Sequence, residues 1–90
     1  MSTQELEKKL TNELIRFIKS EGHVESGTLI KSISFQVTLS NFAVDIKLKA
    51  KEYIQYLDNG NLLDRFFEQK TVIQLIEEFY SDMIEDLLEF

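Results

Sequence analysis

The spacing of the apolar residues changes twice along the chain, and these changes constrain the fold more than any other feature. Near both ends, apolar side chains recur every three or four residues, which is typical of an amphipathic helix. Between the ends they recur at every second residue, which is typical of a half-buried strand. In a chain of 90 residues, this order predicts one α+β domain, residues 1–90, with an antiparallel hairpin packed against an N-terminal and a long C-terminal helix.

The N-terminal segment predicts a helix over about residues 4–20. Ser2 or Thr3 is expected to cap its first turn, and Lys19 and Gly22 are typical of a helix end. The residues that share its apolar face are Leu6, Leu10, Leu14, Phe17 and Ile18. We expect this face to pack against the apolar face of the hairpin.

The central segment predicts a β-hairpin over about residues 33–50. Its apolar residues have odd numbers in the first strand and even numbers in the second strand. The apolar faces therefore match only if the connection has an even number of residues, because a shift by one residue inverts every side chain. A turn near Ser40-Asn41 fulfils this condition. The pairs that it predicts are Leu39 with Phe42, Val37 with Val44, and Phe35 with Ile46.

The C-terminal half predicts a turn followed by a long helix. A short turn or helix, or a third short strand, is expected at residues 52–57, and the run Asp58-Asn59-Gly60-Asn61 is typical of a turn. The long helix is expected at about residues 66–89, where an apolar stripe recurs without a glycine or a proline to interrupt it. The stripe consists of Val72, Ile76, Phe79, Met83 and Leu87, and it is widened by Ile73, Leu75, Tyr80, Ile84 and Leu88.

The residue types that enzymes and metal sites need are scarce in this sequence. It has no cysteine, and its one histidine, His23, has no second histidine or carboxylate at ligand spacing, so we interpret His23 as a loop residue. It also has no phosphate-binding loop and no nucleophile motif, and its acidic residues lack the spacing of a calcium loop. We therefore expect no catalysis, no metal and no cofactor.

The net charge of −6 disfavours direct nucleic-acid binding, because proteins that neutralise phosphates present a basic surface. No apolar run approaches the roughly 20 residues that span a bilayer, so we expect no membrane partner. The charge is also uneven along the chain. Residues 1–45 carry 5 basic and 6 acidic side chains, whereas residues 46–90 carry 5 and 10, so the two halves differ as −1 and −5.

Two sets of charged residues in the second half are candidates for a partner interface. Lys47, Lys49 and Lys51 share the polar face of the second strand. The acidic residues near the C-terminus are Glu77, Glu78, Asp82, Glu85, Asp86 and Glu89, with no basic residue among them. Lysines on a strand commonly form a solvated face that protects a sheet edge. Alternatively, they dock the acidic helix of a neighbouring copy, which favours head-to-tail assembly.

Two sequence strings carry a resemblance to a known family. Residues 26–33, Ser-Gly-Thr-Leu-Ile-Lys-Ser-Ile, and residues 53–60, Tyr-Ile-Gln-Tyr-Leu-Asp-Asn-Gly, resemble in order and spacing two strings of the small tail-completion (head-tail joining) proteins of tailed bacteriophages and prophages. The matching residues are Ser26, Gly27, Leu29, Ser32, Tyr53, Tyr56, Asp58 and Gly60. Phe66-Phe67 stands where the family has an aromatic residue at the start of its last helix. The chain departs from the family at Asn61, where a threonine is usual.

The resemblance implies a structural neck subunit of the virion, made in the host cytoplasm, with no catalytic activity and no cofactor. The family forms rings, and six copies is the expected number. The partners that it implies are further copies of the chain, a head connector or stopper protein, and the tail-tube protein. The residues themselves leave an alternative open, namely an acidic regulatory or inhibitor module that binds a basic protein surface through its C-terminal helix.

Overall fold

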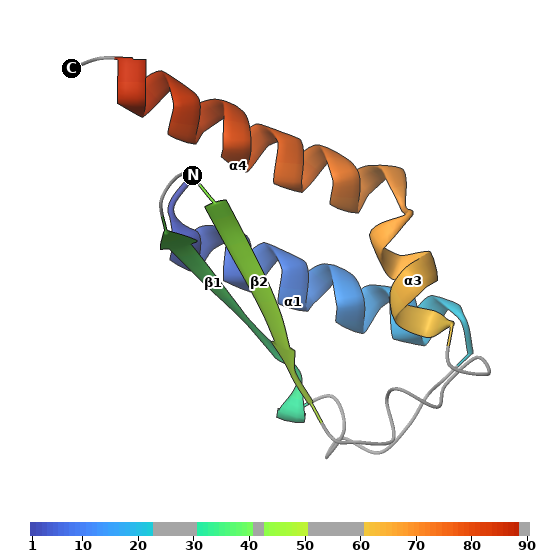
Figure 1. Cartoon of the computed structure of the whole chain (residues 1–90). Helices are drawn as coiled ribbons and strands as arrows, with labels where there is room; N and C mark the ends of the chain where they lie inside the picture. The colour runs from blue at the N-terminus through green and yellow to red at the C-terminus, as the bar shows by residue number, and fades with distance from the viewer. Residues whose placement is uncertain (23–30, 41–42, 51–60, 89–90) are drawn as a thin grey trace.

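The computed structural model describes residues 1–22, 31–40, 43–50 and 61–88. It has the α+β architecture that the sequence predicts, in a shape that extends over 47 × 22 × 18 Å (Figure 1). The elements are α1 (Thr3–Ser20), β1 (Ser34–Ser40), β2 (Ala43–Lys49), α3 (Leu62–Phe67) and α4 (Lys70–Leu88). Because α1 packs against both β1 and α4, it is the element around which the rest is organised.

Helix α1 confirms the first prediction closely. Ser2 is the N-cap, and its hydroxyl oxygen accepts a hydrogen bond from the backbone N–H of Glu5 at 3.1 Å. After the helix, Gly22 adopts a φ of +82°, and its N–H donates to the carbonyl of Lys19 at 3.1 Å. All five residues of the predicted apolar face are buried. The local signals of cap, period and stop were therefore sufficient to define this helix.

The hairpin confirms the predicted faces and corrects the predicted register. Its connection is residues 41–42, so it has an even number of residues, as expected. The predicted strand pairs were wrong, because each residue of β1 pairs with a residue of β2 that lies two positions later than predicted. The connection is one residue later than the predicted Ser40-Asn41. Since moving the turn by one residue moves the pairing by two, every side chain stays on its expected face. The observed pairs are Leu39 with Val44, Val37 with Ile46, and Phe35 with Leu48. Phe42 lies outside the described residues.

The predicted single helix over residues 66–89 was wrong at its start. Phe66 and Phe67 belong to the short helix α3, and α4 begins only at Lys70. Phe66 is fully buried, with its ring centroid 6.0 Å from those of Phe17 and Phe35. This aromatic contact fixes α3 against α1 and β1, and the chain turns at Glu68 before α4 begins. The turn or helix expected at residues 52–57 lies outside the described residues.

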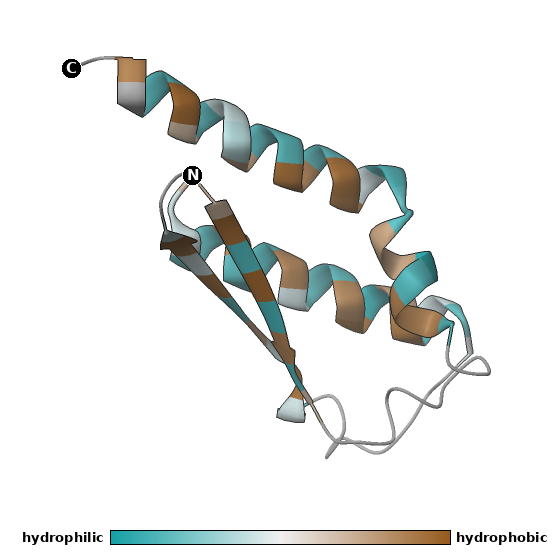
Figure 2. Ribbon diagram, viewed as in Figure 1, coloured by the Kyte–Doolittle hydropathy of each residue, from teal (hydrophilic) through white to brown (hydrophobic). Residues whose placement is uncertain are grey.

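The hydrophobic core lies between α1 and the elements that cover it. The hairpin packs on α1 through β1, and α4 packs on α1 as well. Figure 2 shows the alternation of hydrophobic and hydrophilic residues along β2 that places one face toward the core. The sheet of the described residues has two strands. The buried residues outside α1 are Ile33, Phe35, Val37, Leu62, Phe66, Val72 and Phe79.

Candidate functional site

The acidic residues of the predicted partner surface lie on α4, and most have no internal partner. Within the described residues, those that are exposed and form no ion pair are Glu77, Glu78, Glu85 and Asp86. Asp82 differs, because its Oδ2 atom lies 2.7 Å from the α-ammonium of Met1. This hydrogen bond raises the pKa of the Met1 α-ammonium above its ordinary value of 8.0. Glu89 lies outside the described residues.

An exposed apolar stripe runs along α4 beside these acidic residues. It comprises Ile73, Tyr80, Ile84 and Leu88. Their spacing of seven, four and four residues places them on one side of the helix. Ile73 and Tyr80 are 41% and 37% exposed, and the exposure is higher at the C-terminal end, with 51% at Ile84 and 79% at Leu88. Val72 and Phe79, in contrast, are buried against the core. We call these four exposed residues the α4 stripe.

The apolar period of the sequence predicted that the residues of the α4 stripe widen the apolar face of the long helix, and it did not single them out as a partner surface. The width of the apolar face of the helix could have separated these exposed residues from the buried ones. Val72 and Phe79 already supply the residues that α4 buries, and Ile76 and Met83 are half-buried beside them. The remaining apolar residues exceed what one neighbouring helix can cover.

The predicted lysine stripe lies on the outer face of the hairpin, opposite the face that packs on α1. Lys47 and Lys49 are exposed on β2, and Lys51 lies outside the described residues. The Nζ atom of Lys47 is 3.8 Å from Oδ2 of Asp45, two residues earlier on the same strand. No ion pair joins these lysines to the acidic residues of α4 within the described part of the chain. The two charged surfaces are therefore both available for other molecules.

Most of the matching residues of the two family strings lie outside the described residues, and the structure places only Ser32 among them. Ser32 is half-buried two residues before β1. The others are Ser26, Gly27, Leu29, Tyr53, Tyr56, Asp58 and Gly60, and His23 lies outside the described residues as well. Phe66 and Phe67, at the aromatic position of the resemblance, are in contact with each other and with Phe35.

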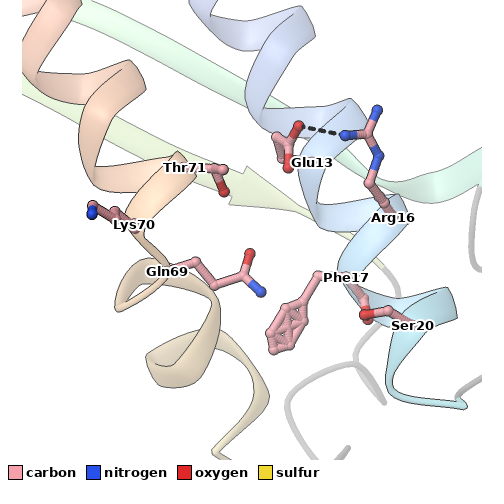
Figure 3. Close-up of a pocket in the computed structure, with 7 residues that line it drawn as sticks. All are labelled: Glu13, Arg16, Phe17, Ser20, Gln69, Lys70 and Thr71. Carbon is pink, nitrogen blue, oxygen red and sulfur yellow. Dashed lines mark hydrogen bonds and ion pairs between the residues drawn. The ribbon is translucent and has the colours of Figure 1, made fainter.

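An open depression of about 440 Å³ lies between α1 and the start of α4 (Figure 3). The residues that line it are Glu13, Arg16, Phe17, Ser20, Gln69, Lys70 and Thr71. Arg16 donates a hydrogen bond to Glu13 at 3.2 Å, and the hydroxyl of Ser20 donates to the carbonyl of Phe17 at 2.8 Å. In Figure 3 the side chain of Gln69 points toward Phe17.

The described ranges contain no group of three or more histidine, aspartate or glutamate residues placed to hold a metal ion. Nor do they contain a helix that is long and apolar enough to cross a membrane. Comparison with known proteins found no matching family model, no matching curated protein and no matching solved structure.

Proposed function

We propose that this chain is a non-catalytic structural subunit that acts by assembling with copies of itself, as a tail-completion or head-tail joining protein of a phage neck. The observation that carries the proposal is the α4 stripe with its unpaired acidic neighbours. The two strings at residues 26–33 and 53–60 supply the family, and the surfaces described above supply the mode of assembly.

Helix α4 has two features that favour a partner over solvent. Its exposed apolar residues gain free energy when they are buried, by roughly 25 cal/mol for each Å² removed from water. Its last turn has no basic residue, and Glu85 and Asp86 lie close to the helix C-terminus, where negative charge is unfavourable. A basic surface beside α4 would relieve the unfavourable charge, and apolar groups in the same contact would bury the exposed residues.

The hairpin supplies such a basic surface on another part of the same chain. Lys47 and Lys49 are exposed on β2, while the acidic residues are exposed on α4. When two complementary surfaces lie on different parts of one chain, each copy binds the next in head-to-tail order, and such contacts close into a ring or continue as a filament. A ring placed between a head connector or stopper and a tail tube fits this geometry. Six copies is the number that the resemblance implies.

The test is a concentration series in sedimentation velocity at low and high salt. The wild type is expected to associate beyond a dimer at low salt, and less at high salt, because exposed charge pairs are screened. Lys47→Glu combined with Lys49→Glu should reduce this association without changing the circular dichroism spectrum. The matched control is Lys8→Glu combined with Lys9→Glu on α1, which alters the net charge equally at exposed positions and should leave association unchanged.

A mixing experiment tests the head-to-tail order. The variant Glu85→Lys with Asp86→Lys loses the acidic surface and keeps the lysines, whereas the lysine variant keeps the acidic surface. Each variant alone should associate poorly, and the mixture should associate again, because each reversed surface then meets a surface of opposite charge on the other variant. A wild type that stays monomeric at every concentration would contradict the proposal. That result would favour the alternative, an acidic module that binds a basic protein.

A further inference from the structure

The two edges of the hairpin differ, and the difference begins with one hydrogen bond. The backbone N–H of Val37 donates to Oε2 of Glu7 at 2.8 Å, so it points away from β2 and toward α1. In an antiparallel pair the direction of these groups alternates along each strand. The backbone groups of Phe35 and Leu39 therefore point the same way as those of Val37. Helix α1, through Glu7, covers the outer edge of β1.

The register of the hairpin also determines the direction in which the backbone groups of β2 point. Val37 pairs with Ile46, so the N–H and C=O groups of Ile46 point away from β1, toward the outer edge of β2. Val44 and Leu48 point the same way. Within the described residues no strand pairs with this edge, because the sheet contains only β1 and β2 there. Among the described residues, the edge of β2 is therefore a row of hydrogen-bonding groups with no strand beside it.

The side chains of the same three residues are incompletely covered. Val44, Ile46 and Leu48 are half-buried, whereas Phe35 and Val37 on β1 are only 5% and 6% exposed. The apolar face of the sheet therefore continues to the outer edge of β2, where its side chains are only partly covered. A strand added at this edge would continue the apolar face and would also satisfy the backbone groups.

We propose that a second copy of this chain supplies that strand, through antiparallel pairing of β2 with β2 about a twofold axis at Ile46. In this register Ile46 lies opposite Ile46 of the second copy, and Val44 lies opposite Leu48 of the second copy. Each of these residues has its backbone groups directed at the partner strand. The apolar faces of the two hairpins then lie on the same side of a four-stranded sheet.

The charges on the outer face select this register. With the axis at Ile46, Asp45 of each copy lies opposite Lys47 of the other, and residues directly opposite each other interact most strongly. A shift of two residues in one direction places Asp45 opposite Asp45. A shift of two residues in the other direction places Lys47 opposite Lys47. Both neighbouring registers oppose like charges, which is unfavourable. The register at Lys47 also places Asp45 opposite Lys49, so it has opposite-charge pairs beside its like-charge pair. Only the register at Ile46 has opposite-charge pairs without a like-charge pair.

This contact goes beyond the head-to-tail assembly proposed above, and it uses a different surface. It leaves α4 uncovered, and it places Lys49 opposite Ala43, so Lys49 stays free for an acidic helix. Lys47 is the residue that both contacts share. A substitution of Lys49 therefore distinguishes the two proposals, because it should weaken the head-to-tail contact and leave the pairing of β2 with β2 unchanged.

Charge reversal with rescue tests the pairing, measured as the dimer dissociation constant in sedimentation equilibrium. Lys47→Asp and Asp45→Lys should each raise this constant by about tenfold or more, because each creates two like-charge pairs across the axis. The double variant should restore dimer formation, since it exchanges the two charges. Lys49→Asp is the matched control and should leave the dimer unchanged. If the double variant is as weak as the single variants, or if Lys49→Asp weakens the dimer equally, the edge pairing is wrong.

A cross-linking experiment tests the register without changing a charge. The chain has no cysteine, so an introduced one has only its copy in a second chain to react with. Residues opposite each other in a sheet are close enough for a disulfide. Ile46→Cys should form a disulfide-linked dimer on mild oxidation. Val44→Cys and Leu48→Cys are matched controls that should not, because neither lies opposite itself. Equal cross-linking of all three, or none from folded Ile46→Cys, would overturn the proposal.

Discussion

Helices α1 and α4 are nearly equal in length and both are amphipathic, yet they use their apolar residues differently. Helix α1 buries five apolar residues between the hairpin on one side and α4 on the other. Helix α4 buries Val72 and Phe79 and leaves the α4 stripe exposed. The comparison teaches that an amphipathic period predicts a helix but does not predict how much of its apolar face the same chain covers. The uncovered part is where we propose that a neighbouring copy binds.

The largest effect is expected from disrupting the contact between α1 and the hairpin. Val37→Asp places an unpaired carboxylate in the core and should cost several kcal/mol, about 3 or more, of the free energy of unfolding. Gln36→Asp is the matched control, since Gln36 is the exposed neighbour on the same strand. It should change this free energy by less than about 0.5 kcal/mol. Urea unfolding followed by circular dichroism measures both. Equal losses would mean that the faces of β1 were assigned wrongly.

The next effect compares the two helices directly. Leu10→Ala should cost about 2 to 5 kcal/mol of the free energy of unfolding, because Leu10 is fully buried on α1 and its removal leaves a cavity. Ile84→Ala should cost less than about 1 kcal/mol, because Ile84 is 51% exposed on α4. Thermal and urea unfolding at low protein concentration measure the isolated chain. Similar costs at the two positions would remove the difference between α1 and α4.

A smaller effect is expected from a comparison of one carboxylate on each helix, Glu7 on α1 and Glu77 on α4. Glu7→Ala removes the acceptor of the Val37 N–H and should cost about 1 to 3 kcal/mol of the free energy of unfolding. Glu77→Ala on α4 should be close to neutral, within about 0.5 kcal/mol, because Glu77 is exposed and has no ion-pair partner among the described residues. A neutral result for Glu7→Ala would show that α1 does not secure the edge of β1.

The smallest effect concerns the ion pair between Met1 and Asp82. The pKa of the Met1 α-ammonium is raised in the folded chain, so the stabilisation is fully present below pH 8.0 and is lost as the pH rises through the raised pKa. Asp82→Asn should therefore lower Tm slightly near neutral pH. The difference from the wild type should shrink as the pH is raised to about 10. A difference that stays constant over this range would mean that the α-ammonium is not the partner that matters.

The parts of the fold that depend on local signals were predictable from the sequence. The bounds of α1 follow from Ser2, the apolar period and Gly22, and the faces of the hairpin follow from its alternation. The register was wrong by two residues because a turn at residues 40–41 or at residues 41–42 preserves the same faces. The break before α4 was missed because no glycine or proline marks it. It depends on the packing of Phe66 against Phe17 and Phe35, which are distant in sequence.

The candidate surfaces were predictable in part. The lysines of the second strand and the acidic residues near the C-terminus were visible as charge patterns, and their exposure follows from the same periods. The α4 stripe and the open edge of β2 were not visible in this way. Both depend on which elements cover which faces. The sequence does not show that α1 covers the edge of β1 through Glu7, while no described strand pairs with the outer edge of β2.

The most direct test of the central claim, that the α4 stripe binds a neighbouring copy, is sedimentation velocity of Ile84→Ser combined with Leu88→Ser. Leu39→Ser is the matched control, because Leu39 is a similarly exposed apolar residue that lies on the hairpin, with 46% exposure. We predict that the α4 variant keeps the Tm of the wild type at low concentration and forms no species larger than a dimer, while the control assembles normally. An α4 variant that assembles as fully as the wild type at every concentration would contradict the account.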